Sequence, residues 1–131
     1  MKELLKSKIN SAINSFSKLG ESDLISDILT STNIIVKALK SKKKIIFCGN
    51  GGSAADSQHL SAELVGKFKK KRKALNSISL TTDTSAITSI GNDMGFDKVF
   101  SRQLEAIGEK GDVLFALTTS GKSANILNAL K

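Results

Sequence analysis

The chain has 131 residues, which is enough for one domain with a modest core but few for a complete α/β enzyme. Its hydrophobic fraction of 40% and charged fraction of 24% are those of an ordinary globular protein. The single cysteine excludes an internal disulfide and fits a reducing compartment. No stretch has the continuous apolar core of a signal peptide or a membrane span. We therefore expect a cytoplasmic protein with no membrane partner.

The formal net charge of +8 suggests a nucleic-acid partner, and the cluster of basic residues in segment 67–73 (KFKKKRK) strengthens this suggestion. However, the chain has no Trp or Tyr and its six Phe are scattered, so no platform for stacking bases is visible. The segment lies where a helix should give way to a strand, and such a connector is usually a solvated surface. We expect no nucleic-acid partner, and keep an anionic substrate or a partner surface as alternatives.

Residues 1–41 are predicted to form a pair of amphipathic helices, because apolar residues recur there at three- and four-residue steps. Gly20 is the expected end of the first helix, and Ser22 the expected cap of the second. The two apolar stripes comprise Leu5, Ile9, Ala12, Phe16 and Leu19, then Ile25, Ile28, Ile35 and Leu39. Another subunit or the chain's own sheet could cover them.

Residues 42–131 alternate between strand and helix patterns, which indicates right-handed βαβ crossovers, a parallel sheet and helices on both faces. The predicted strands are 45–48, 77–81 and 112–117. The predicted helices are 54–68, 84–90, 96–107 and 123–131, the last one introduced by Gly121. No proline or low-complexity linker marks a boundary, so we expect one α/β domain over 1–131.

The final helical pattern stops without a capping residue, and three strands leave an unprotected sheet edge. We therefore expect the chain to be a fragment that lacks the last strands and the C-terminal helix of its fold.

Two glycine- and hydroxyl-rich turns each follow a predicted strand and introduce a helix. The first is 49–53 (GNGGS) and the second is 118–123 (TTSGKS). Glycine lets the backbone approach a ligand closely, and free N–H groups at a helix start favour an anion. Each turn alone could be only a tight connection or an N-cap. Because the carboxyl ends of parallel strands meet at one edge of a sheet, together they predict a phosphate site there.

Asp56, His59 and Glu63 are spaced so that a helix projects all three to one side. A His/Glu pair four residues apart can hold a divalent metal or share proton transfer, although such residues are often merely exposed. Asn92 and Asp93 stand in the predicted connection between two helices, where they either form a turn or project polar groups over the site.

At these residues the chain resembles the sugar isomerase (SIS) family and, within it, the isomerases of seven-carbon sugar phosphates. The resemblance covers nearly the whole chain and is strongest in three strings: CGNGGSAADSQHLSAELVGKF, TTDTSAITSIGNDMGF and TTSGKSANIL. It implies a three-layer αβα fold and a homotetramer with sites shared between subunits. The implied reaction converts sedoheptulose 7-phosphate to D-glycero-D-manno-heptose 7-phosphate through an enediol, for bacterial surface heptose in lipopolysaccharide or capsule.

The resemblance also implies roles for single residues. Glu63 matches the glutamate that moves a proton between adjacent carbons, and His59 and Glu63 match two ligands of a divalent metal, typically zinc. Asp56 is placed behind these ligands. The implied phosphate contacts are Thr118, Thr119, Ser120 and Ser123, with Ser53 nearby, and the implied sugar contacts are Asn50, Gly51, Gly52, Asn92 and Asp93. The family's second catalytic residue, a histidine, and a metal-binding glutamine have no counterpart in these 131 residues.

Three alternatives are weighed against an isomerase. One is a non-catalytic SIS protein that binds the bacterial replication initiator, which lacks a glutamate at the place of Glu63. Another is a sugar-phosphate-sensing domain that binds without turnover, which proton exchange next to the substrate carbonyl would distinguish. The last is a nucleic-acid binder using segment 67–73, which predicts an affinity that falls steeply with salt.

Overall fold

The computed structural model describes residues 1–131, and their contacts divide the chain into two units, Met1–Ile34 and Ile35–Lys131. The division falls inside the second helix. The first unit contains helix α1 (Lys2–Gly20) and the first part of α2 (Leu24–Lys40). Helix α1 ends at Gly20 as predicted, and none of its residues is buried. No helix combines the length and apolarity that crossing a bilayer requires.

Ser22 closes the end of α1 and does not cap the start of α2, so that expectation was wrong. Its hydroxyl donates to the carbonyl of Leu19 at 2.8 Å, and α2 begins only at Leu24. The physical reason is that the last carbonyls of a helix have no partner within it, and a nearby hydroxyl can satisfy one of them.

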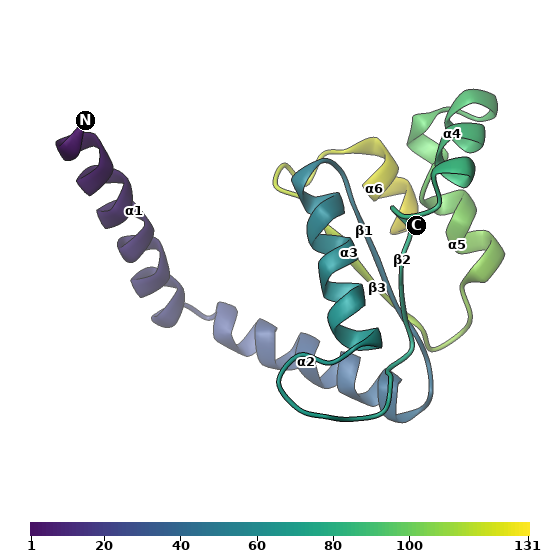
Figure 1. Ribbon diagram of the computed structural model, residues 1–131, viewed down its shortest axis with the longest axis horizontal. Coiled ribbons are helices and arrows are strands. Elements are labelled where there is room, and N and C mark those ends of the chain that lie inside the picture. Colours follow the sequence, from purple (N-terminus) through teal and green to yellow (C-terminus); the bar gives the residue numbers. More distant parts are fainter. The chain divides into compact units, whose positions relative to one another are not determined.

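The second unit is built around a three-stranded parallel sheet with the strand order β2-β1-β3 (Figure 1). Strand β1 (Ile45–Gly49) is central, with β2 (Ser77–Ser79) and β3 (Val113–Leu117) at its sides. All five residues of β1 are buried, which is typical of a parallel strand covered on both faces. The α/β class with a parallel sheet is therefore confirmed.

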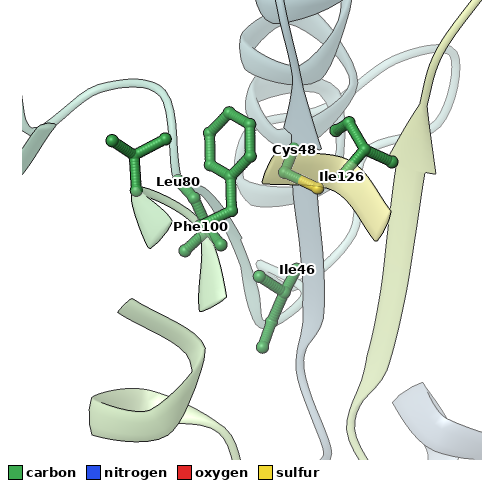
Figure 2. Packing of buried hydrophobic residues seen from close by; sticks show 6 residues of the cluster. Ile46, Cys48, Leu80, Phe100 and Ile126 are labelled. Carbon is green, nitrogen blue, oxygen red and sulfur yellow. The ribbon is translucent and has the colours of Figure 1, made fainter. Parts of the chain in front are cut away.

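Alternate residues of β1 face two separate hydrophobic clusters, as the pleat of a strand requires. On one face, Ile45 and Phe47 pack with Ala38 of α2 and with α3 (Gly52–Val65). On the other face, Ile46 and Cys48 join a cluster that Figure 2 shows between the sheet and the later helices. Its other members come from outside β1: Leu80, Val99, Phe100 and Ile126.

The second cluster brings four later elements to the same face of the sheet. These are α4 (Thr84–Asp93), the short 3₁₀ helix η1 (Phe96–Lys98), α5 (Ser101–Ile107) and α6 (Ala124–Ala129). Together with α3 and the end of α2 on the opposite face, they give the unit its three layers. The three-layer αβα architecture expected from the resemblance is thus present.

Several element boundaries differ from the sequence prediction for reasons of packing. The predicted helix 96–107 is broken between η1 and α5, where Val99 and Phe100 turn into the core and are 1% and 3% exposed. The second strand ends at Ser79 instead of residue 81, because the Thr81 hydroxyl bonds to Ser79 Oγ at 2.8 Å and to the Ala54 carbonyl at 3.3 Å.

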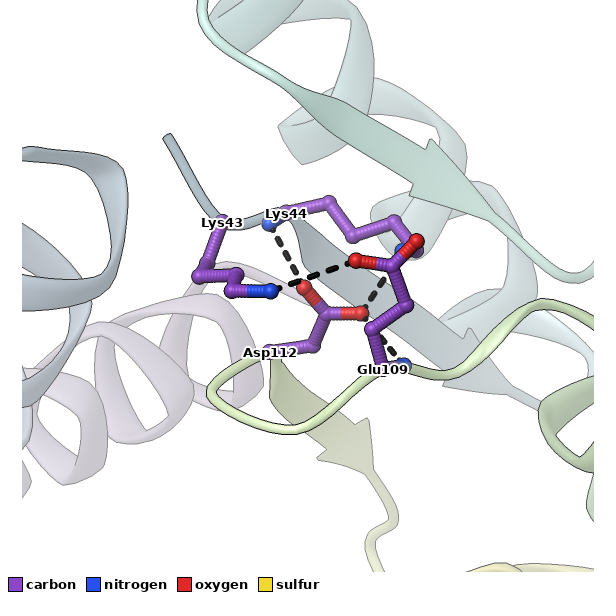
Figure 3. Close-up of polar contacts among 4 residues, drawn as sticks. All are labelled: Lys43, Lys44, Glu109 and Asp112. Carbon is purple, nitrogen blue, oxygen red and sulfur yellow. Dashed lines mark hydrogen bonds and ion pairs between the residues drawn. The ribbon is translucent and has the colours of Figure 1, made fainter. Parts of the chain in front are cut away.

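The amino ends of β1 and β3 are joined by a nearly buried carboxylate, Asp112, whose side chain is 6% exposed (Figure 3). It accepts from Lys44 Nζ at 2.7 Å, from the Lys44 N–H at 2.9 Å and from the Glu109 N–H at 2.8 Å. Burial acts to raise the pKa of Asp112, but these hydrogen bonds and the Lys44 charge outweigh it, so its pKa lies below the ordinary value of 3.8. This pair fixes the edge of the sheet opposite the carboxyl ends.

Candidate functional site

The two turns expected to bind a ligand lie at a topological switch point. Strand β1 leads into α3 on one face of the sheet, whereas its neighbour β3 leads into α6 on the other face. Chains that leave adjacent strands toward opposite faces open a crevice at the carboxyl edge, and ligands of α/β proteins bind in such crevices. The fold therefore brings the turns 49–53 and 118–123 to one edge, as the sequence predicted.

The turn after β1 depends on its glycines. A Cβ on Gly49 would lie 2.5 Å from the Ser53 carbonyl oxygen, and Gly51 has a φ of +56°. Gly51 is the N-cap of α3, so Ser53 is not the capping residue that we expected; it lies inside the first turn, where its carbonyl accepts from Ser57 Oγ at 2.8 Å. The N–H groups of Gly52 and Ser53 have no acceptor within the helix and remain available to an anion.

The turn after β3 uses part of its polar groups internally. Thr118 Oγ1 accepts from the Gly121 N–H at 3.1 Å, and Ser120 Oγ accepts from the Lys122 N–H at 3.2 Å. These two N–H groups are therefore not free, contrary to the expectation of an open cradle of N–H groups. The hydroxyl hydrogens of Thr118 and Ser120 can still donate, because each oxygen acts as an acceptor in these bonds.

A residue that we did not single out from the sequence, Asn125, joins the first turn to the start of α6, directly after the second turn. Asn50 Nδ2 donates to Asn125 Oδ1 at 2.9 Å, and Asn125 Nδ2 donates to Asn50 Oδ1 at 2.8 Å. Asn125 is only 3% exposed, although it is polar. The sequence shows only an asparagine next to the apolar Ile126, and neither its burial nor its partner can be read from that pattern.

Asn50 and Gly51 line a cavity of about 160 Å³ together with Gly49, Thr81 and residues of the adjoining helices. Asn92 and Asp93 are not among the lining residues. They belong to the last turn of α4, which runs through Asp93, and Asn92 Nδ2 donates to Asp93 Oδ1 at 2.7 Å. The expectation that they lie in a linker between helices was wrong, because the helical hydrogen bonding continues past Ile90.

His59 and Glu63 lie one turn apart on α3, with 3.8 Å between His59 Nε2 and Glu63 Oε1. The His59 side chain is 72% exposed and that of Glu63 31%. Both donor atoms suit zinc, which in proteins takes four ligands. No group of three or more His, Cys, Asp or Glu residues that could hold a metal occurs in the structure, so Asp56 does not complete a set with them. The chain thus offers two ligands.

Glu63 lies far along α3 from the turn that begins this helix. It follows Gly52 by eleven positions on one helix, which corresponds to about 16 Å along the axis. The cavity that Glu63 and His59 line, about 390 Å³ and mostly apolar, shares no residue with the cavity at Asn50. Within a single chain, Glu63 and the first turn therefore line different cavities.

Arg72 organises the end of α3, a role that the sequence did not reveal. Its guanidinium donates to the main-chain carbonyls of Glu63 at 2.6 Å, Leu64 at 2.8 Å and Lys73 at 3.0 Å. One charge of the basic segment is thus committed to holding the connector against the helix that carries Glu63. A positive group at a helix C-terminus also interacts favourably with the helix dipole.

Cys48, next to the first turn, is not a candidate nucleophile. Its side chain is fully buried in the core, and burial raises the pKa of its thiol to about 11. Because the thiolate is the reactive form, this residue has a packing role.

The fold and the switch-point crevice define a doubly wound α/β domain that binds its ligand at the carboxyl edge of a parallel sheet. A family model described as "SIS domain" matches residues 9–131. The chain belongs to the SIS domain family.

Its relatives in that family are named phosphoheptose isomerases. The chain is 52% identical over 130 residues to that of a Nitratiruptor species, an alignment covering 99% of this chain and 66% of the relative. It is 49% identical over 131 residues to that of Akkermansia muciniphila, covering 100% of this chain and 68% of the relative. The structure of phosphoheptose isomerase from Neisseria gonorrhoeae is similar with a TM-score of 0.90 and 41% identity, covering 98% of this chain and 66% of that chain. The chain spans about two thirds of the length of these relatives.

Proposed function

We propose that the chain binds a seven-carbon sugar phosphate and takes part in its aldose–ketose isomerisation, from sedoheptulose 7-phosphate to D-glycero-D-manno-heptose 7-phosphate. In this proposal the product supplies heptose for the bacterial cell surface, and the reaction takes place in the cytoplasm. The observation that carries the proposal is the pairing of the turns 49–53 and 118–123 at one switch point. The printed names of the relatives supply the substrate class.

The proposed phosphate contacts are the hydroxyls of the second turn, which can donate without any nearby arginine. They are Thr118, Thr119, Ser120 and Ser123, with Ser53 from the first turn. The proposed sugar contacts are Asn50, Gly51 and Gly52, together with Asn92 and Asp93. Asn50 is supported best, because it lines the cavity beside the first turn, whereas Asn92 and Asp93 would need a ligand that extends toward the end of α4.

Glu63 is the proposed general base and acid. Its carboxylate would take a proton from the carbon next to the substrate carbonyl and return it to the neighbouring carbon, which passes through an enediol. His59 and Glu63 would hold a divalent metal, zinc by the chemistry of the donors, with the remaining ligands from water or another chain. Such a metal, when bound, stabilises the negative charge that develops on the substrate oxygen.

The distance between Glu63 and the crevice of its own chain supports a site shared between copies. A second copy would bring its Glu63 to the turns of the first, within the homotetramer that the resemblance implied. The apolar residues of α1 offer surface for such an assembly, because none of the helix is buried, and Leu5, Ile9 and Phe16 are 57%, 59% and 75% exposed.

The proposal is tested by hydrogen exchange on sedoheptulose 7-phosphate in D₂O, followed by NMR. We expect the wild type to exchange the hydrogen next to the carbonyl, and Glu63→Gln to lose at least about 100-fold in rate, the usual contribution of a positioned base. Binding of the sugar phosphate should persist in Glu63→Gln. Glu109→Gln is the matched control, because Glu109 is an exposed carboxylate at the opposite edge of the sheet. Exchange that survives in Glu63→Gln would remove Glu63 from this role.

Sharing of the site between copies is tested by mixing two inactive variants. Glu63→Gln removes the base, and Ser120→Asp places a negative charge where the phosphate is proposed to bind. If each site combines two copies, unfolding and refolding the two variants together should restore exchange, since some sites receive an intact Glu63 and an intact turn. A mixture as inactive as its components would contradict the shared site.

A further inference from the structure

A single pair of side chains ties the turn after β1 to the start of α6, the helix that follows the second turn. We propose that Asn125 is a positioning residue: it sets the spacing of the two turns and the orientation of the Asn50 amide, and so makes the crevice prefer a sugar phosphate to phosphate alone. The inference rests on the proposed function, because it concerns the same ligand.

The first support is the geometry of the pair. Each amide gives one N–H and receives one, at 2.9 and 2.8 Å. An amide that flipped alone would set donor against donor and acceptor against acceptor, and both bonds would be lost. Asn125 is anchored by its own burial, at 3% exposure, and by the neighbouring core residue Ile126 at 1%. Asn125 is therefore held by the core, and its two hydrogen bonds determine the orientation of the Asn50 amide.

The second support is what remains free on Asn50. A side-chain amide has two N–H groups and an oxygen with two lone pairs. The pair uses one of each, and no other side-chain hydrogen bond of Asn50 is present in the structure. One donor and one acceptor site thus remain on a residue that also lines the cavity beside the first turn. A sugar hydroxyl, which both donates and accepts, matches this combination.

The third support is the absence of any other side-chain hydrogen bond between the turns. The ladder between β1 and β3 ends with the partners Gly49 and Leu117, after which the chain diverges toward opposite faces. The two bonds between Asn50 and Asn125 are the only side-chain hydrogen bonds from 49–53 to 118–125. Without them the two turns would be held relative to each other by the strands beneath and by the packing of Ile126 against β1.

The consequence depends on how much of the crevice a ligand uses. A sugar phosphate contacts both turns, so it gains from a spacing that is set before it binds. Inorganic phosphate can meet Ser53 and the hydroxyls of the second turn, but it has no sugar hydroxyl to bond to Asn50, so it gains nothing from the orientation of the Asn50 amide. Loss of the pair should therefore weaken the sugar phosphate selectively, by about 10-fold, while affinity for inorganic phosphate changes less than about 2-fold.

The test compares Asn125→Leu with Asn128→Leu. Leucine keeps the branching of asparagine at Cγ, although it is larger, and removes both bonds of the pair. Asn128 is one turn further along the same chain segment and donates to the Asp97 carbonyl and to Asp97 Oδ2, both at 3.0 Å, without touching either turn. Its replacement removes these two hydrogen bonds and a longer one from Lys131 Nζ to Asn128 Oδ1 at 3.4 Å, so it is a control for the loss of amide hydrogen bonds in the same segment. Dissociation constants for sedoheptulose 7-phosphate and for inorganic phosphate are measured by NMR titration of the full chain.

We expect a selective loss of sugar-phosphate affinity in Asn125→Leu and unchanged affinities in Asn128→Leu. Equal losses in the two variants, or an equal loss for both ligands in Asn125→Leu, would overturn the inference. Wild-type protein that binds inorganic phosphate but not the sugar phosphate would overturn the proposed function instead.

The pair itself is tested without any ligand and without any variant. In the wild type, the Nδ2 hydrogens of Asn125 should exchange with solvent at least about 10-fold more slowly than those of Asn10, which lies on exposed helix α1. Exchange at the same rate would show that the tie does not form, and would overturn the inference even if Asn125→Leu failed to fold.

Discussion

Replacing Asp112 with asparagine should destabilise the second unit strongly while leaving the crevice intact. The carboxylate accepts three hydrogen bonds, from Lys44 Nζ, the Lys44 N–H and the Glu109 N–H. Asparagine keeps one acceptor oxygen, and its NH₂ group faces the donors that the other carboxylate oxygen served. At least one donor loses its partner, and the nearly buried Lys44 ammonium, 16% exposed, loses its counter-charge.

The magnitude follows from these losses. An unpaired buried donor costs about 1–3 kcal/mol, and removing one member of a buried ion pair costs about 3–5 kcal/mol. Because Lys44 keeps some contact with water, we expect the lower end, a loss of about 3 kcal/mol in the free energy of unfolding. Glu109→Gln is the control: it removes an ion pair to Lys43 at 3.2 Å whose carboxylate is 66% exposed, and such a surface pair is worth less than about 1 kcal/mol.

The assay is urea denaturation followed by far-UV circular dichroism, since the chain has no Trp or Tyr for fluorescence. The pH dependence adds a second check. The folded pKa of Asp112 lies below its ordinary value of 3.8, so its contribution to stability is present above that pH and is lost as the pH falls through the folded pKa. The gap between wild type and Asp112→Asn should therefore narrow in acid below pH 3.8. Equal stability of Asp112→Asn and Glu109→Gln at pH 7 would refute the reasoning.

Two further predictions concern the first turn and the strand before it. Gly49→Ala should lower the free energy of unfolding by about 1–3 kcal/mol, because the added Cβ would lie 2.5 Å from the Ser53 carbonyl oxygen. Gly52→Ala is the control and should change stability little, since a Cβ at Gly52 would meet open space. Urea denaturation measures both variants, and equal effects would contradict the close approach at Gly49. Cys48, whose thiol pKa is raised by burial to about 11, should resist iodoacetamide at pH 8 in the folded protein and react once urea unfolds it, as mass spectrometry can show. Rapid alkylation of the folded chain would contradict the burial of Cys48. Since the pKa of Cys48 in the unfolded chain is near 9.0, the stability that its burial contributes should decline as the pH rises from there toward 11.

Local patterns in the sequence determined the class of fold and the position of the turns. The apolar run of β1 predicts a strand buried on both faces, because its residues have no polar alternation. Gly51 supplies the positive φ that the turn requires, and only local backbone sterics are needed to expect it. The alternation of strand and helix predicts parallel pairing, since consecutive parallel strands need a crossover. These features depend on neighbours in the chain, which a sequence displays directly.

The tertiary structure decided which distant residues meet. Asn50 and Asn125 are 75 positions apart, and Lys44 and Asp112 are 68 apart, so no local sequence pattern predicts either contact. The length of α3 also separates Glu63 from the turn that begins the same helix, although their nearness in sequence suggested a single site. A helix converts eleven positions into a distance of about 16 Å.

In this protein the order of strands and helices could be inferred from residue type and period alone. The assembly of the site depends on rigid elements that carry its parts to different places, and only coordinates reveal where those parts lie. The physical reason is that backbone preferences act over a few residues, whereas side-chain contacts at the crevice depend on the packing of the whole sheet.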